Sequence, residues 1–196
     1  MQTVRRAVLF VICALLLLDF AVTASWHRFR FEHETVENLG RLAIVACILG
    51  RCWCTLYIGG RKGETLVDIG PYSICRNPLY FFSFLGAAGV GAQTGSALVA
   101  LVCLLVTWAV FRAVVSKEER FLLQRHGESY AEYLKSTPRF LPNPARWRSV
   151  ESVEVFPKRV VNTFLDGLLF VAVIPVIEGM EKLQEMGVLP VLMNLP

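Results

Sequence analysis

Apolar residues in this chain gather in long blocks that polar segments separate. A helix needs about 20 mostly apolar residues to cross a bilayer, and five blocks approach or reach that length. The clearest of them contains a single charged residue, Arg112. The last carries several polar residues and Pro175, so we expect it to tilt, break or lie in the interface. The predicted spans are 4–25, 38–58, 78–95, 96–115 and 160–180.

The first block has two interpretations. Arg5 and Arg6 precede the apolar run 7–18, and Val-Thr-Ala at 22–24 looks like a cleavage site, which is the outline of a signal peptide. The apolar stretch continues to Trp26, however, and at ~1.5 Å per residue it is long enough to span a bilayer. We favour an uncleaved first helix.

The third block is short and rich in glycine, and small residues let helix backbones approach closely within lipid. Only a few residues separate this block from the fourth, so the two helices are expected to form a tight antiparallel hairpin. The predicted fold class is all-α, a polytopic membrane helix bundle of about five helices with a cytoplasmic helical cap. The glycines are Gly86, Gly89, Gly91 and Gly95.

Charge sets the predicted orientation. The chain is 55% apolar and 18% charged, with a formal net charge of +4. Nine of its 20 basic residues lie between Lys117 and Arg159, after the fourth span. Basic loops face the cytoplasm, so this region, the loop 59–77 and the N-terminus are expected inside. We expect a bacterial inner membrane, or the endoplasmic reticulum if the chain is eukaryotic. No basic stretch alternates with aromatic residues, so we expect no nucleic-acid partner.

The six cysteines form no CxxC pair, and five of them fall inside apolar segments. Such cysteines are ordinarily small buried hydrophobes. We therefore expect neither a disulfide framework nor a bound metal. The cysteines are Cys13, Cys47, Cys52, Cys54, Cys75 and Cys103.

Two polar segments on the predicted cytoplasmic side carry candidate chemistry, and each also has a structural interpretation. In the first, residues 70–80, Gly70-Pro71 signals a turn. Asn77 suits the cap and Pro78 the first position of the third helix. In this interpretation Arg76 anchors the chain to lipid phosphate.

In the second segment, residues 116–142, Ser116 and Glu119 have the spacing of a capping box that would start a new helix. Positions 122, 123, 126, 130, 133 and 134 then lie close to one face, which carries Leu, His and Tyr side chains. That face suits either an amphipathic helix resting on the bilayer or a cover over a ligand.

Together the two segments resemble the isoprenylcysteine carboxyl methyltransferase family, within the wider group that includes phospholipid N-methyltransferases. The resemblance covers about residues 40–142. The family His is Asn77 here, and the Phe before the second-motif Gly is His126. The first motif supplies Gly70, Pro71, Tyr72, Arg76, Pro78 and Tyr80, and the second supplies Glu118, Glu119, Leu122, Gly127, Tyr130, Tyr133 and Pro142. The expected regions are an N-terminal helix and loop at 1–36, a methyltransferase core at 37–148 and an extension at 149–196.

The resemblance implies S-adenosylmethionine as the cofactor and a lipophilic acceptor that arrives through the bilayer. The nominal acceptor is the carboxylate of an isoprenylcysteine. Methylation of a phospholipid or another small lipophile, and a non-catalytic scaffold of the same fold, are the alternatives. The candidate catalytic residues are Arg51 and Arg139. The candidate cofactor-binding residues are Gly70, Pro71, Tyr72, Arg76, Asn77, Pro78, Tyr80, Glu118, Glu119, Tyr130 and Tyr133.

Two charged residues inside predicted spans need an explanation, because charge is costly in lipid. Arg51 either extends toward the cytoplasmic interface or faces the bundle interior, where it would meet an anionic acceptor. Asp19 lies deeper in the membrane by count, so we do not pair it with Arg51.

Overall fold

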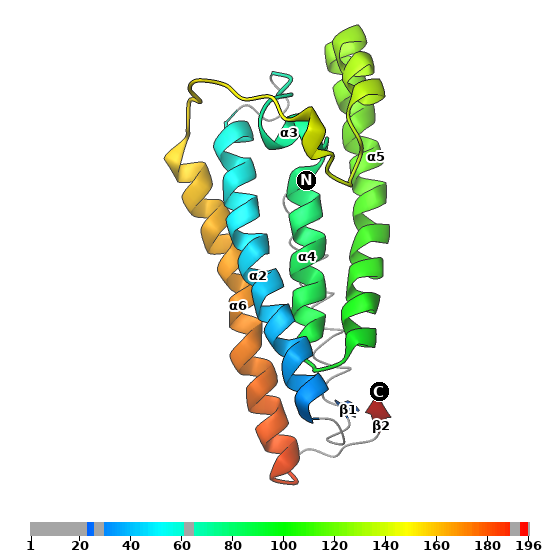
Figure 1. Ribbon diagram of the computed structural model, residues 1–196, viewed down its shortest axis with the longest axis vertical. Helices are drawn as coiled ribbons and strands as arrows, with labels where there is room; N and C mark the ends of the chain where they lie inside the picture. Colours follow the sequence, from blue (N-terminus) through cyan, green and yellow to red (C-terminus); the bar gives the residue numbers. More distant parts are fainter. Residues whose placement is uncertain (1–22, 26–29, 61–64, 189–192, 196) are drawn as a thin grey trace. The chain divides into compact units, whose positions relative to one another are not determined.

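Helices make up nearly all of the computed structural model, which describes residues 23–25, 30–60, 65–188 and 193–195. Within these residues three helices are long and apolar enough to cross a membrane, and a fourth apolar helix is shorter. The prediction of an all-α membrane bundle is therefore confirmed. The elements are β1 (Thr23–Ser25), α2 (Arg30–Ile58), α3 (Pro71–Ile74), α4 (Pro78–Ala92), α5 (Ala97–Ser136), the 3-10 helix η2 (Pro144–Arg146), α6 (Pro157–Glu185) and β2 (Met193–Leu195) (Figure 1).

Four of the predicted spans correspond to helices. The second falls within α2, the third matches α4, the fourth forms the start of α5, and the fifth lies within α6. α6 continues as a helix through Pro175, so the expected break is absent. Most of the first predicted span lies outside the described residues, as do Asp19 and Cys13. Its last three residues form β1, which pairs in parallel with β2, and not a helix.

The chain forms two compact units, and each of the four main helices contributes residues to both. Unit 1 comprises Met1–Ile44, Ala87–Leu105 and Leu169–Pro196, whereas unit 2 comprises Val45–Gly86 and Val106–Leu168. Both polar segments singled out from the sequence, 70–80 and 116–142, fall in unit 2.

Glycines set the helix spacing in unit 1. A Cβ added to Gly91 of α4 would lie 2.8 Å from the Cα of Ala100 in α5, so the backbones of this hairpin approach closely. On another face of α4, a Cβ added to Gly89 would lie 2.7 Å from the carbonyl oxygen of Gly40 in α2. The tight hairpin predicted from the small residues is therefore confirmed.

Aromatic residues fill the interior of unit 2. Phe111 of α5 is 1% exposed, and its ring centroid lies 4.9 Å from that of Tyr80 and 6.0 Å from that of Phe84, both in α4. α5 kinks at Gly127, where φ is 56° and ψ is −126°. The five cysteines in the described part are free thiols, and four of them are buried, as expected of small hydrophobes.

Candidate functional site

The segments 70–80 and 116–148 meet within unit 2 through main-chain hydrogen bonds. The amide of Arg76 donates to the carbonyl of Pro138 at 2.9 Å, and the amide of Asn143 donates to the carbonyl of Ile74 at 2.9 Å. The thiol of Cys75 lies 3.2 Å from the carbonyl oxygen of Phe140. These bonds fix the register between two stretches that are far apart in the sequence.

Local turn chemistry builds the first segment. Gly70 has φ 56°, a left-handed value that favours glycine, and an added Cβ would lie 2.3 Å from the ring of Tyr57. Pro71 then begins the one-turn helix α3, as the Gly-Pro signal predicts. The hydroxyl of Ser73 donates to the carbonyl of Gly70 at 2.6 Å and accepts from the amide of Arg148 at 3.0 Å.

The carboxylate of Glu119 lies at the centre of the contacts between the segments. Arg139 Nη2 approaches its Oε2 to 2.8 Å, and Arg76 Nε lies 3.4 Å from its Oε1. Asn77 Nδ2 donates to the same Oε1 at 3.3 Å. The side chains of Glu119, Arg76 and Arg139 are 13%, 12% and 30% exposed, so this cluster lies mostly out of water. We call Glu119, Arg76, Asn77 and Arg139 the Glu119 cluster.

The structure corrects the predicted capping role of Ser116 and adds contacts to that of Asn77. Asn77 precedes α4 and its carbonyl accepts from the amides of Tyr80 and Phe81 at 3.1 Å, while its side chain donates to Glu119 and, at 3.1 Å, to the carbonyl of Arg139. Ser116 lies inside α5, which is continuous from Ala97, so it starts no new helix. Its hydroxyl donates to the carbonyl of Arg112 at 2.8 Å and accepts from Arg139 Nη2 at 2.8 Å.

Tyrosines join the cluster to its surroundings. Tyr80 donates its hydroxyl to Oε2 of Glu118 at 3.0 Å. Tyr133 donates to the carbonyl of Tyr72 at 2.6 Å, which fastens α3 to the end of α5. The ring of Tyr130 lies 5.8 Å from that of Tyr133, and burial raises the pKa of Tyr130 to about 12. Leu122 and His126 are half-buried and Tyr130 and Tyr133 are buried, so these predicted face positions are the covered ones on both sides of the kink at Gly127.

Four buried side-chain polar atoms in these segments make no hydrogen bond within the described part of the chain. They are the hydroxyl of Tyr72, the Nε atoms of Arg76 and Arg139, and Nε2 of His126. The approach of Arg76 Nε to Glu119 is an ion pair that lacks the geometry of a hydrogen bond. Tyr72 is 4% exposed, and burial raises the pKa of its hydroxyl well above the ordinary value. A buried donor without a partner lowers the free energy of unfolding by about 1–3 kcal/mol. A ligand that accepts hydrogen bonds from these groups would remove that destabilisation.

Arg51 lies apart from the Glu119 cluster in the chain but in the same unit. Its side chain is buried, with only 2% of the residue exposed, so it faces the protein interior and does not extend toward the interface. It interacts with Cys47, and its carbonyl accepts a hydrogen bond from Thr55 at 2.8 Å, both within α2. A role for Arg51 at the acceptor stays a prediction.

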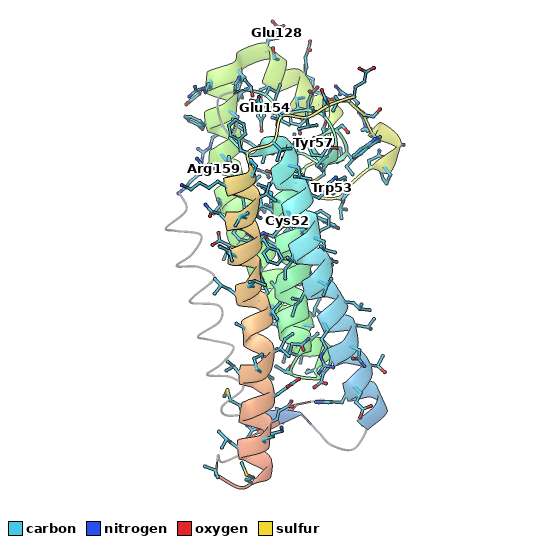
Figure 2. All side chains as sticks on the ribbon, turned by 90° about the vertical axis from the view of Figure 1, so that its left-hand side faces the viewer. Cys52, Trp53, Tyr57, Glu128, Glu154 and Arg159 are labelled. Carbon is cyan, nitrogen blue, oxygen red and sulfur yellow. The ribbon has the colours of Figure 1, made fainter. Side chains whose placement is uncertain are left out.

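Several residues at this site were not predicted from the sequence. Arg148 forms an ion pair with Asp68, which precedes the first segment, and its amide donates to the hydroxyl of Ser73 within that segment. Trp147 stacks on Trp53 of α2 with ring centroids 5.7 Å apart. Trp53 in turn meets Tyr57 edge-on at 6.5 Å, and Figure 2 labels these two residues on α2. The only signal in the sequence was the cluster of aromatic and basic residues around 146–148, which is also typical of a membrane interface.

The donor set suits a zwitterionic ligand with an extra cationic centre, such as S-adenosylmethionine. Guanidinium N–H groups bind a carboxylate, the Glu118 carboxylate can accept from an ammonium, and tyrosine rings favour cations. The hydroxyl of Tyr72 and Nε of Arg139 are donors from which such a group could accept. Arg76 and Arg139 would hold the carboxylate, while Glu118, Tyr72 and Tyr80 would face the cationic side.

Comparison with known proteins agrees with this chemistry. Residues 41–129 match the phospholipid methyltransferase family. The chain is 35% identical to the cobalt-zinc-cadmium resistance protein CzcN of Cupriavidus metallidurans, over 97% of this chain and 86% of that protein. It is 34% identical to the nickel-cobalt-cadmium resistance protein NccN of Alcaligenes xylosoxydans xylosoxydans, over 81% and 74%.

The mouse protein-S-isoprenylcysteine O-methyltransferase is 35% identical over 64% of this chain and 52% of its own length. No solved structure matches the chain. The family motifs, the membrane helices and the relatives agree. The chain belongs to the same family of membrane proteins as CzcN and NccN, and it is similar to the isoprenylcysteine carboxyl methyltransferases and the phospholipid methyltransferases.

Proposed function

We propose that this protein transfers a methyl group from S-adenosylmethionine to a lipophilic acceptor at the Glu119 cluster. The observation that carries the proposal is the set of buried polar atoms without hydrogen bonds, which both converging segments contribute. S-adenosylmethionine supplies a methyl group on a sulfonium, which a nucleophile takes in line with the C–S bond. The protein must position the two reactants and provide a matched electrostatic environment.

The two adjacent glutamates would have different roles. Both oxygens of Glu119 already bind side chains, so this residue would position Arg76 and Arg139 and not touch the cofactor itself. Glu118 lies one residue away, and its Oε2 accepts from the hydroxyl of Tyr80. A carboxylate beside a tyrosine ring suits the cofactor's ammonium and sulfonium charges. This assignment narrows the expectation that either glutamate binds the cofactor.

The acceptor is proposed to be a carboxylate on a lipidic molecule, as in an isoprenylcysteine. A carboxylate is nucleophilic without losing a proton at neutral pH, whereas an ammonium must be deprotonated first. Asn77, which stands where the family has His, cannot accept that proton. Arg51, which is buried in α2, would attract the acceptor anion. Arg139, which is 30% exposed, would do so in an arrangement where Arg76 alone holds the carboxylate of the cofactor.

Methylation of a phospholipid amine is the second candidate, because residues 41–129 match the phospholipid methyltransferase family. The two bacterial relatives are named for resistance to cobalt, zinc, nickel and cadmium. We extend that context to this chain and propose that the methylated product contributes to metal tolerance. The cytoplasmic orientation of the site, taken from the positive-inside pattern, belongs to the same proposal.

A binding titration and a methyl-transfer assay test the proposal. The first measures binding of S-adenosylhomocysteine to protein purified in detergent, comparing Glu118→Gln with Glu132→Gln, an exposed glutamate on the same helix. We expect saturable binding that Glu118→Gln weakens by about tenfold or more and Glu132→Gln leaves unchanged. Absence of binding to folded, unmodified protein would instead favour a non-catalytic scaffold.

The methyl-transfer assay identifies the acceptor class. Labelled methyl from S-adenosylmethionine is offered with an N-acetyl-S-prenylcysteine or with phosphatidylethanolamine vesicles. We expect label in a base-labile ester of the prenylcysteine. Label that is stable to base and found in the lipid would identify amine methylation and reject the carboxylate acceptor.

A further inference from the structure

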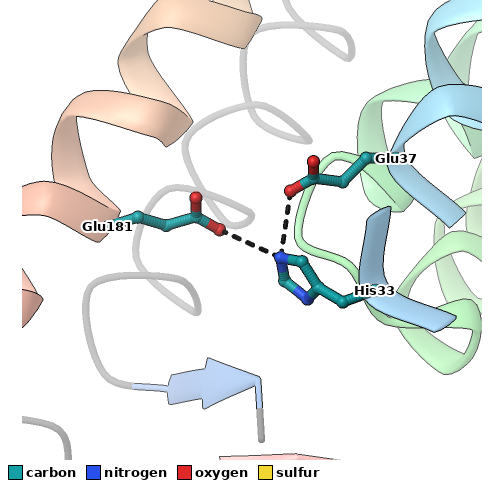
Figure 3. A group of neighbouring side chains, drawn as sticks. All are labelled: His33, Glu37 and Glu181. Atoms are coloured by element: carbon teal, nitrogen blue, oxygen red, sulfur yellow. Dashed lines mark ion pairs between the residues drawn. The ribbon is translucent and has the colours of Figure 1, made fainter. Parts of the chain in front are cut away.

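A second polar cluster lies in unit 1, where α2 begins and α6 ends. The ring nitrogen Nε2 of His33 lies 3.0 Å from Oε1 of Glu37 and 3.9 Å from Oε1 of Glu181. Figure 3 shows the two carboxylates approaching the same ring nitrogen from different helices. The three ligand atoms lie within 4.8 Å of one another. We call these residues the His33 cluster.

The backbone around His33 holds its ring in place. A Cβ added to Gly95 would lie 1.8 Å from the Nδ1 of His33, so the turn between α4 and α5 closes directly over that side of the imidazole. Gly95 also has φ 69°, which a side chain rarely adopts. With Nδ1 covered by this turn, the imidazole presents Nε2 toward the carboxylates.

Glu37 is held from two sides. Gln93, which is 3% exposed, donates its side-chain amide to the carbonyl of Glu37 at 3.2 Å and ties that turn of α2 to α4. Arg41 Nη2 lies 3.5 Å from the second carboxylate oxygen of Glu37 and 3.3 Å from Glu178. An arginine on the outer oxygen leaves the inner oxygen, Oε1, directed at His33. Contacts of this kind orient metal ligands in proteins.

Two helices contribute carboxylates to the same imidazole nitrogen. Glu37 of α2 lies 3.0 Å from Nε2 of His33, and Glu181 of α6 lies 3.9 Å from the same atom. A cation at this point of convergence would contact all three ligand atoms, which lie within 4.8 Å of one another.

We propose that His33, Glu37 and Glu181 form a binding site for a divalent cation of the zinc, cobalt and nickel group. One imidazole nitrogen and two carboxylate oxygens are ligands that these ions accept, with water completing the coordination. Zinc bonds of ~2.0–2.2 Å place neighbouring ligands roughly 3.4 Å apart, so the 3.9 Å distance from His33 to Glu181 would shorten by about half an ångström. Ligand atoms up to 4.8 Å apart would close by a little over one ångström, through rotation of the glutamate side chains. The side chains are 14–29% exposed, which leaves room for water.

The site is independent of methyl transfer, since none of its residues belongs to the Glu119 cluster. The sequence expectation of no metal is replaced by this proposal. By the predicted topology, the start of α2 faces the side away from the cytoplasm, so the bound cation would come from outside the cell or from the lumen.

Zinc binding to chelator-treated protein in detergent tests the site, with ZnCl₂ as the titrant and thermal unfolding as a second readout. We expect one zinc per chain and a rise in Tm with zinc, because a ligand that binds only the folded state stabilises it. Glu181→Gln should weaken binding by about tenfold or more and abolish the rise in Tm. Glu34→Gln, an exposed glutamate on the same turn of α2, should change neither.

Cobalt distinguishes this site from a cysteine site. With CoCl₂ we expect weak visible bands and no thiolate charge-transfer band in the near ultraviolet, because the ligands are nitrogen and oxygen. Zinc affinity that is equal in Glu181→Gln and Glu34→Gln, a thiolate band, or no stoichiometric binding to folded protein would each overturn the proposal. S-adenosylhomocysteine binding by Glu181→Gln should equal that of the unmodified protein, whichever result the metal titration gives.

Discussion

Replacing Glu119 by Gln should destabilise unit 2 by about 2 kcal/mol, because two guanidinium groups then lack their shared counter-charge. The strongest interaction that the substitution removes is the 2.8 Å ion pair with Arg139, and hydrogen bonds to charged groups contribute about 1.5–3 kcal/mol. The 3.4 Å pair with Arg76 adds about 0.5 kcal/mol. The Gln oxygen still accepts one of these bonds, which offsets part of the destabilisation.

The partial exposure of the cluster bounds this value. Exposed ion pairs contribute about 0.2–1 kcal/mol, whereas removing one partner of a fully buried pair costs about 3–5 kcal/mol. Glu119 and Arg139 are 13% and 30% exposed, so the contribution belongs between these limits. The same exposure makes the effect sensitive to salt, and it should shrink as ionic strength rises.

A double-mutant cycle measures the interaction directly. Equilibrium chemical unfolding in detergent is compared for the unmodified protein, Glu119→Gln, Arg139→Gln and the double variant. We expect a coupling free energy of about 1–2 kcal/mol between the two positions, with Glu132→Gln as a charge-matched exposed control near zero. Additivity of the two single variants within about 0.3–0.5 kcal/mol would refute the view that Glu119 holds Arg139.

Three further outcomes are expected. Tyr133→Phe removes the donor to the buried carbonyl of Tyr72 and should lower the free energy of unfolding by about 1–2 kcal/mol. Gly70→Ala should cost at least about 2 kcal/mol, since φ is 56° and the added Cβ meets a tyrosine ring, whereas Gly179→Ala in α6 meets no atom within 4 Å and should stabilise by about 0.5–1 kcal/mol. Because burial raises the pKa of Tyr130 to about 12 from 10, its contribution is complete below pH 10 and is lost as pH rises toward 12. A pH series of unfolding should therefore fall less steeply for Tyr130→Phe.

Membrane spans were the most predictable part of this fold. Crossing a bilayer needs about 20 apolar residues whatever the surrounding structure, so length and hydrophobicity alone located α2, α5 and α6. The hairpin of α4 and α5 followed from the small residues Gly89 and Gly91 for the same reason, since close approach requires the absence of a side chain.

Roles of single polar residues were less predictable. Ser116 and Glu119 have capping-box spacing, yet α5 runs straight through them, because the main-chain hydrogen bonds of a continuing helix leave no free amide to cap. Both side chains bind Arg139 instead, a partner that only the tertiary structure provides. A local pattern states what a residue is able to do, and long-range neighbours decide which of these possibilities is used.

The His33 cluster likewise could not be predicted from a local sequence pattern. His33 and Glu37 are one turn apart and form an ordinary pair in the sequence, but Glu181 is far away along the chain. Its approach depends on the register between α2 and α6 within unit 1, which no periodicity reveals. The motif residues at 70–80 and 116–142 were recognised in advance only because a family resemblance already encodes their convergence.

Asn77 offers the sharpest test of what the departure from the family His means. Its amide nitrogen donates two bonds, to Glu119 at 3.3 Å and to the carbonyl of Arg139 at 3.1 Å. An imidazole nitrogen carries a single hydrogen, so Asn77→His keeps only one of these two bonds. In the variant the carbonyl of Arg139 still accepts the hydrogen bond from the thiol of Cys75 at 3.6 Å, and Glu119 still forms its ion pairs with the guanidinium groups. The loss should therefore be confined to one hydrogen bond, about 1 kcal/mol of unfolding free energy.

The effect of Asn77→His on methyl transfer separates the two acceptor classes. If the acceptor is a carboxylate, no proton has to leave it, so an added base at this position should leave kcat with the prenylcysteine nearly unchanged from about pH 6 to 8. If the acceptor is an amine, a histidine that titrates near pH 6.5 would accept its proton, and kcat should rise with pH through that range in the variant alone. A pH-dependent gain of about tenfold or more in Asn77→His would place proton removal in the reaction and overturn the carboxylate assignment. A flat profile would mean that Asn77 acts only by holding Glu119 and the chain at Arg139, which is the role its two hydrogen bonds describe.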